Sequence, residues 1–232
     1  LSGGGGLSTT SAAPLTGGTG NSLTLPGLAT IGTTNVDADI TANQTLTSTG
    51  AVSAGGAFTV TGAATLGGNV TTAGSQTYGS ITLANDAALL SNGGNQLTLG
   101  TSVVGAGHNL GLTSSGGAVS TGNISGVATL TTGVGTNLSA IDVQANAAQL
   151  GGNVTATTGS VTFGSTVLNN GLILSAVSGT VSTGPVTGNG NDLMLTGNAV
   201  VGTTTNVDVL VANQTLTTTS TVGATSVSVT GN

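Results

Sequence analysis

The sequence predicts an all-β protein, a parallel β-solenoid (β-helix) in which short coils stack along one axis. Three observations predict this fold. The composition is rich in β-branched and turn residues, short runs of alternating apolar and polar residues end at Gly or Asn, and short motifs recur along the chain. An antiparallel β-sandwich also uses many short strands with frequent turns, and these observations leave it open as the alternative fold.

The composition is that of a β protein. The chain has 232 residues, of which 37% are hydrophobic and only 1% aromatic, and it has no Cys and no Trp. Val, Ile and Thr suit a pleated surface, Gly and Asn suit tight turns, and the helix formers Lys, Arg and Glu are absent. Disorder is a third interpretation, but disordered segments are usually more polar and lack ordered alternation.

The chain has no Lys or Arg, and its formal net charge is −6. Without cations it cannot neutralise phosphate groups, so we expect no nucleic-acid partner and no docking on an anionic membrane surface. No run of 18 apolar residues occurs, so we expect no membrane insertion. The chain starts at Leu1 without the basic and then apolar pattern of a signal peptide. We therefore expect that a leader has been removed or that the chain is a piece of a longer one.

Two regions are predicted along the chain. Residues 1–20 are dominated by Gly, Ser and Thr and are predicted to form a flexible arm or linker. Residues 21–232 are predicted to form the solenoid, because short alternating runs follow one another there and no sustained 3.6-residue stripe indicates a helix. The clearest predicted strands are Leu23–Leu25, Phe58–Val60, Ile81–Leu83, Leu97–Leu99, Val161–Phe163 and Val227–Val229.

Short motifs recur at long distances in the chain. The recurring pairs are Asn35–Asp37 with Asn206–Asp208, Ala42–Thr47 with Ala212–Thr217, and Leu66–Thr71 with Leu150–Thr155. Their spacing fits a coil of roughly 21 residues, made of two half-coils of about 10 or 11 residues each. At that coil length the solenoid would hold roughly ten coils and be about 50 Å long.

Stacking explains how such a chain could have a core. A single coil of short strands cannot bury its apolar face alone, whereas stacked coils pair their backbones about 4.8 Å apart and align small apolar side chains in a narrow core. Gly and Asn at the corners supply the positive φ angles that tight turns require. A residue such as Leu97 is therefore predicted to point into the core.

The runs Gly190–Gly197 and Ala63–Val70 resemble, in composition and local pattern, the shafts of filamentous-haemagglutinin-type and autotransporter adhesins. The resemblance covers most of residues 21–232. It implies a right-handed parallel β-helix, export from a bacterium-like cell, an extracellular or cell-surface location, and a role in attachment or biofilm matrix formation. The chain departs from this family in lacking Lys entirely, and it shows no secretion domain that would define the export route.

Candidate sites are few. Asp37 and Asp39 alternate, so on a strand both carboxylates would face one way and could seat Ca²⁺, although two carboxylates that merely face water are the simpler interpretation. His108 is the single candidate general base, and its neighbours Gly107 and Asn109 predict a solvent-exposed turn. The Asp residues are scattered and no cation is present to stabilise an anionic transition state. We therefore expect no catalytic residues, no cofactor and no enzyme activity.

The expected function is structural. The strand pattern Val227–Val229 carries no polar cap, so we expect the protein to assemble head to tail with other copies of itself by β-stacking, as a subunit of an extracellular or cell-surface fibre. Its outside partners would be host cells, neighbouring cell surfaces or polysaccharide. Two alternatives remain: a segment of a giant secreted adhesin shaft, and an ice-binding solenoid. Ice binding would need aligned Thr side chains, which the sequence allows us to align over only two or three coils.

Overall fold

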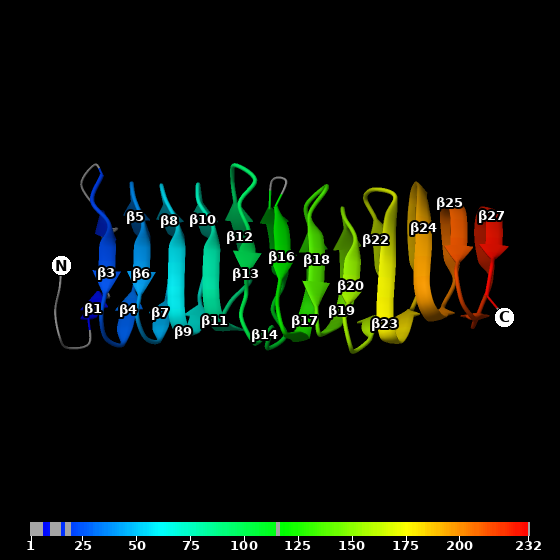
Figure 1. The fold of residues 1–232 in the computed structure, drawn as a ribbon, viewed down its shortest axis with the longest axis horizontal. Helices are drawn as coiled ribbons and strands as arrows, with labels where there is room; N and C mark the ends of the chain where they lie inside the picture. Colours follow the sequence, from blue (N-terminus) through cyan, green and yellow to red (C-terminus); the bar gives the residue numbers. More distant parts are fainter. Residues whose placement is uncertain (1–6, 10–14, 17–19, 115–116, 232) are drawn as a thin grey trace.

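The computed structural model describes residues 7–9, 15–16, 20–114 and 117–231, and these form a single rod of about 11 stacked turns (Figure 1). The described residues contain 27 strands and no helix, and every strand pair is parallel, as between Leu23 and Ile40. The predicted all-β parallel solenoid is therefore confirmed, and the antiparallel sandwich is wrong. No segment of the described chain forms a helix suited to crossing a membrane.

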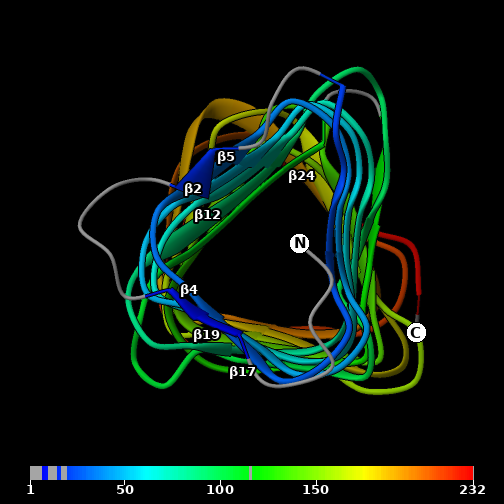
Figure 2. The same cartoon turned by 90° about the vertical axis from the view of Figure 1, so that its left-hand side faces the viewer.

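Each coil has three sides, which give the rod a triangular cross-section (Figure 2). We call the side that contains β3 (Leu23–Leu25) face A, the side that contains β4 (Ala29–Ile31) face B, and the side that contains β5 (Thr34–Val36) face C. The chain then returns to face A at β6 (Ile40–Ala42), which pairs with β3.

Most strands lie on a single face. Face A contains β3, β6, β13 (Leu97–Thr98), β16 (Ala118–Ser120), β18 (Asn137–Ala140) and β20 (Val154–Ala156). Face B contains β1 (Leu7–Thr9), β4, β7 (Leu46–Ser48), β14 (Ser102–Val104), β21 (Val161–Phe163) and β26 (Leu216–Thr218). Face C contains β2 (Leu15–Thr16), β5, β8 (Val52–Ala54), β10 (Val70–Thr72), β12 (Ala87–Ser91), β15 (Leu110–Ser114) and β22 (Thr166–Leu168).

The longer strands bend around a corner and continue on a second or third face. They are β9 (Phe58–Leu66), β11 (Gln76–Leu83), β17 (Asn123–Thr132), β19 (Asp142–Leu150), β23 (Leu172–Thr183), β24 (Val186–Val201), β25 (Thr204–Ala212) and β27 (Val222–Val229). Five of the six strands that the sequence predicted most clearly have the predicted bounds or lie within a longer strand, and in the sixth β13 ends one residue early, at Thr98.

The coil length differs from the prediction. The half-coil division is wrong, because each coil has three sides of about six residues rather than two of ten or eleven. The advance per coil also varies: it is 17 residues from Leu23 to Ile40 and 23 residues from Leu89 to Leu112. Corner loops, such as the turn that contains Asn92, lengthen the coils in the middle of the rod, so the predicted length of about 21 residues holds only locally.

The core consists of inward columns in which one side chain from each coil stacks on the next. Most strands have the burial pattern that alternation predicts, with a buried residue on each side of a more exposed one. Leu97 is fully buried on face A between Gln76 and Val119 of the neighbouring coils, as predicted for an inward position. Small aliphatic side chains fill most of this core, and Phe58 and Phe163 are its largest fully buried members.

One polar cluster lies inside the core. The Gln76 side chain is fully buried, and its Nε2 donates to the carbonyl oxygens of Val70 (3.2 Å) and Leu90 (2.9 Å). The Tyr78 hydroxyl donates to Gln76 Oε1 at 2.8 Å, and burial raises the pKa of Tyr78 well above its ordinary value. Since both side chains are hydrogen-bonded, the cluster avoids the cost of unpaired buried polar groups.

The predicted arm overlaps the solenoid. Within residues 1–20, Leu7–Thr9 forms β1 and Leu15–Thr16 forms β2, which pair in parallel with β4 and β5. This pairing satisfies backbone groups along the edges of β4 and β5, which would otherwise form an open sheet edge. The remaining residues of the predicted arm, apart from Gly20, lie outside the described residues.

Candidate functional surfaces

The two candidate calcium ligands lie at a corner rather than on a strand. Asp37 and Asp39 follow the end of β5 and precede β6, so the premise that both lie on one strand is wrong. Asp39 Oδ1 accepts a hydrogen bond from the backbone N–H of Ala57 in the next coil at 2.8 Å. No group of three or more acidic or His side chains suited to a metal ion occurs in the described part of the chain.

Asp39 belongs to a set of side chains that bind one coil to the next, a role that the sequence analysis missed. Asp142 Oδ1 accepts from Ser160 N at 2.7 Å, and Asp192 Oδ1 accepts from Val209 N at 3.1 Å. Each of these Asp residues directly precedes the first buried residue of a strand segment. That placement is the signal that could have identified them, because it sets the carboxylate beside the backbone of the coil stacked above.

His108 lies in a corner turn, as predicted. Its backbone N–H donates to Gly105 O at 2.9 Å, and its Nδ1 lies 3.6 Å from Asp86 Oδ1. Asn109 donates to Asp86 from both its backbone (2.9 Å) and its side chain (2.8 Å). These two hydrogen bonds are the main cause of a lowered pKa at Asp86, and His108 adds a smaller contribution. Asp86 and Asn109 are exposed and His108 is half-buried, and their contacts link neighbouring coils at this corner.

Face A carries one outward hydroxyl side chain per coil along most of the rod. We call this set the hydroxyl ladder. Its members, in register from coil to coil, are Thr24, Thr41, Thr59, Thr77, Thr98, Ser120, Ser139, Thr155, Ser175 and Thr196. All are exposed or half-buried, so the ladder is a surface open to solvent. It extends far beyond the two or three coils over which the sequence allowed Thr residues to be aligned.

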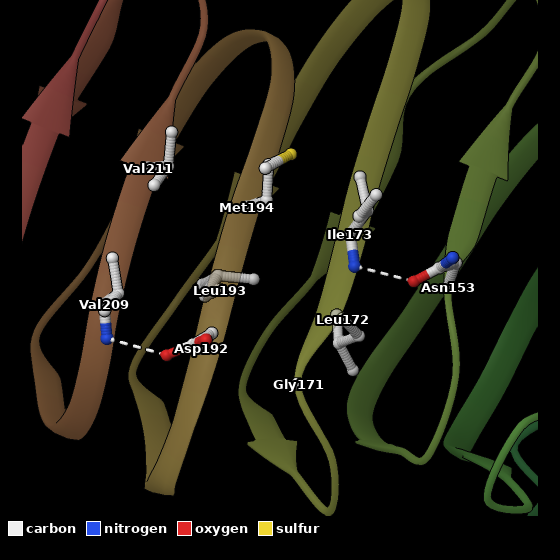
Figure 3. A pocket seen from close by; sticks show the side chains of 9 residues that line it. All are labelled: Asn153, Gly171, Leu172, Ile173, Asp192, Leu193, Met194, Val209 and Val211. Atoms are coloured by element: carbon white, nitrogen blue, oxygen red, sulfur yellow. Dashed lines mark hydrogen bonds between the residues drawn. The ribbon is translucent and has the colours of Figure 1, made fainter.

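Beside the ladder, the C-terminal part of face A carries an apolar patch, which we define as Ile173, Met194, Val209 and Val211. These residues line a shallow depression of about 420 Å³, together with Gly171 and Asp192 (Figure 3). Met194 is 41% exposed, and its two in-register neighbours, Ile173 and Val211, are half-buried.

The last described coil consists of β26 and β27, and Val227 and Val229 of β27 are 49% and 47% exposed. Their in-register partners in the coil before, Leu210 and Ala212, are fully buried. Residues 213–231 carry no charge and no Pro, so this edge lacks the side chains that usually prevent strand pairing.

No family model, curated protein or solved structure matches this chain. The resemblance to adhesin shafts therefore stays a prediction.

Proposed function

We propose that this chain is a structural, non-enzymatic subunit of an extracellular or cell-surface fibre that grows by stacking solenoids end to end, with a role in adhesion or matrix formation. The observation that carries the proposal is the recurrence of Ala42–Thr47 as Ala212–Thr217 on the same side of the rod, which gives late coils a surface like the one on which early coils already stack. On β27, Val227 and Val229 lie in register with the fully buried Leu210 and Ala212 and offer an apolar strand edge for stacking.

A second copy is the occupant that fits this edge. A coil stacked on β26 and β27 would pair their free backbone groups and bury Val227 and Val229 in the extended core. Apolar burial of this kind contributes about 25 cal/mol for each Å² removed from water, and the new parallel ladder adds backbone hydrogen bonds. No charged side chain in residues 213–231 opposes such stacking.

The repeated motifs support self-recognition. The segment Ala212–Thr217 repeats Ala42–Thr47, and the inward column of face B contains both Leu46 and Leu216. Within the chain, Leu46 is covered by Ala64 of the next coil. The last coil therefore presents a surface like one on which this chain already stacks a coil of its own, and such a head-to-tail contact does not close.

The test is assembly of the purified 232-residue chain, followed by negative-stain microscopy and sedimentation. We expect long filaments one solenoid wide. Val229→Asp should leave single rods of about 50 Å, because it places a charge in the joint. The matched control Ser228→Asp, on the same strand but facing outward, should still form filaments. A wild-type chain that stays monomeric at high concentration would contradict the proposal.

A covalent continuation of the coils, as in a giant adhesin shaft, would present the same surface without a joint between copies. Denaturing mass analysis of native fibres separates the two arrangements. A single species near 21.6 kDa supports assembly from separate subunits. A much larger polypeptide would contradict assembly from separate subunits and would mean that the chain is a segment of a longer shaft.

The hydroxyl ladder favours ice binding as a second candidate function. Its hydroxyls repeat about every 4.8 Å along a flat face, which provides a regular array for ordered water. Freezing hysteresis is the measurement, with Thr98→Tyr in the ladder compared with Thr82→Tyr on face B. We expect the first variant to lose hysteresis and the second to keep it. A wild-type protein without hysteresis would contradict ice binding, and the ladder would then contribute only cross-strand contacts between Thr and Ser side chains.

A further inference from the structure

Three Asn residues of the chain directly precede a Gly: Asn92, Asn170 and Asn189. An Asn-Gly pair can modify itself, because the backbone nitrogen of Gly can attack the side-chain carbonyl carbon of Asn when no Cβ obstructs its approach. The attack needs an Asn side chain that is free to turn toward its own backbone and a Gly N–H that is not held in a hydrogen bond. The fold places the three pairs in different surroundings, so it should select among them.

Asn92 has the surroundings that favour the attack. It lies at the corner between face C and face A, and both Asn92 and Gly93 are exposed. With the other described residues, neither the Asn92 side chain nor the Gly93 N–H forms a hydrogen bond. The corner is fixed through the Asn92 backbone, whose N–H donates to Thr72 O (2.9 Å) and whose carbonyl oxygen accepts from Asn95 Nδ2 (2.8 Å). The side chain can therefore turn while the backbone beside it stays in place.

Asn189 has the opposite surroundings. Its side-chain nitrogen donates to Leu168 O of the neighbouring coil at 3.1 Å, and its backbone has a φ of 54° within β24. Attack on this side chain would break the hydrogen bond to Leu168 and would require the strand backbone to change its conformation. Asn189 should therefore keep its amide in the folded protein.

Asn170 is intermediate between the other two. Asn170 and Gly171 are exposed, but Gly171 directly precedes β23 and lies beside Asp192, so that a Cβ at position 171 would be 3.7 Å from the Cβ of Asp192. The nitrogen of Gly171 attacks after it has lost its proton, and a carboxylate nearby disfavours the negative charge that results. Asn170 should therefore react more slowly than Asn92.

We propose that Asn92 is a site at which the folded protein selectively and spontaneously deamidates. Gly93 N forms a bond to Asn92 Cγ, the bond between Cγ and Nδ2 breaks, and Nδ2 leaves as ammonia with the proton that Gly93 N has lost. Water then adds to one of the two carbonyls of the resulting five-membered imide and opens the ring, which gives Asp or isoaspartate at position 92. The inference does not depend on the proposed fibre.

The product changes the corner in two ways. It adds one carboxylate to a chain whose formal net charge is already −6. In isoaspartate the backbone also runs through the former side chain and is longer by one carbon atom. This change strains the hydrogen bonds that join Asn92 to Thr72 and to Asn95. The backbone N–H of residue 92 should therefore lose protection from hydrogen exchange in the modified protein.

The experiment incubates the chain at mildly alkaline pH, once folded and once unfolded in urea. Mass spectrometry of its peptides follows each Asn, with fragmentation that distinguishes Asp from isoaspartate. In urea the three pairs should react at similar rates, because each is an Asn followed by Gly. In the folded chain Asn92 should react at least about tenfold faster than Asn189, which corresponds to about 1.4 kcal/mol in the barrier. Asn92→Gln is the matched variant, and it should remove the fast reaction because its longer side chain must close a larger ring.

Three results would overturn the inference. If Asn92 keeps its amide in the folded chain but loses it in urea, the corner protects the side chain instead of exposing it. If the three Asn residues react at equal rates in the folded chain, the fold does not select among them. If the fast reaction persists in Asn92→Gln, it belongs to another residue. Each of these results leaves the proposed fibre unaffected, because no step of the reaction involves a second copy.

Discussion

Placing a carboxylate at Leu97 tests whether the inward columns hold the rod together. Leu97 is fully buried between Gln76 and Val119, and Leu97→Asp would remove a packed leucine and leave a charge in its place. Loss of the leucine costs roughly 2–5 kcal/mol, and a buried unpaired carboxylate adds several kcal/mol. Because the chain has no Lys or Arg to pair with it, we expect a loss on the order of 5 kcal/mol or more at pH 7.

The pH dependence separates the charge from the lost packing. Burial raises the pKa of the introduced carboxyl above its unfolded value, so the unfolded state binds fewer protons at neutral pH. The deficit in unfolding free energy should therefore be largest above the folded pKa and shrink as the pH falls toward the unfolded pKa. Below that pH only the packing loss should remain. Leu97→Asn removes the same packing without a charge and should show no such recovery.

Denaturant unfolding followed by circular dichroism gives the overall loss, and hydrogen exchange shows whether the coils around residue 97 open first. Both are needed because stacked repeats can unfold in parts. Thr98→Asp is the control, since Thr98 faces outward one residue away. If Leu97→Asp unfolds like Thr98→Asp, or if its stability does not rise at lower pH, the assigned register of face A is wrong.

Three further outcomes are expected. Gly100→Ala should lower the free energy of unfolding, measured by chemical denaturation, by about 2 kcal/mol or more, because the φ of Gly100 is +71° and a Cβ there would overlap a carbonyl group of the neighbouring coil. Gly107 has a φ of +86° but free space around it, so Gly107→Ala should lower the free energy of unfolding by only about 1–2 kcal/mol. In an absorbance titration Tyr78 should remain protonated above pH 10 while the protein is folded. Because the folded pKa is raised, protonated Tyr78 contributes its full stability to the folded protein below pH 10, and this contribution falls as the pH rises further. We therefore expect ionisation of Tyr78 to coincide with unfolding of the protein. In an NMR titration, the lowered pKa of Asp86 should return toward 3.8 in the variant Asn109→Gly. Because the folded pKa is lowered, the ionised Asp86 stabilises the folded protein above the ordinary pKa, and this contribution is lost as the pH falls through the folded pKa.

The strands could be predicted because their signal is local. A segment such as Phe58–Val60 carries its own alternation, and the parallel stack requires nothing more of it than two inward side chains. Coil length could not be predicted in the same way, because it depends on corner loops that the core does not constrain. The advance is 16 residues from Leu138 to Val154 but 23 from Leu89 to Leu112, and no single period fits both.

The variable coil length also prevents prediction of the surface columns from the sequence. The hydroxyl ladder is regular in space, yet the spacing in sequence from Thr59 to Thr77 is 18 residues and that from Thr77 to Thr98 is 21, so a fixed repeat misses it. The role of Asp39 was missed for a related reason, because its partner Ala57 is known only once the coils are stacked. Properties of a single strand can be read from the sequence, whereas properties of a column require the register.

The placement of the carboxylates explains how a chain without cations can stack so closely. Asp39, Asp142 and Asp192 each accept a backbone N–H from the following coil, so these side chains link neighbouring coils without Lys or Arg. Acidic side chains thus serve the cohesion of the rod while still limiting its approach to other copies. In the proposed fibre, contact between copies would use the backbone edge at β27, which does not depend on opposite charge. Such assembly should strengthen with ionic strength, unlike assembly held together by ion pairs.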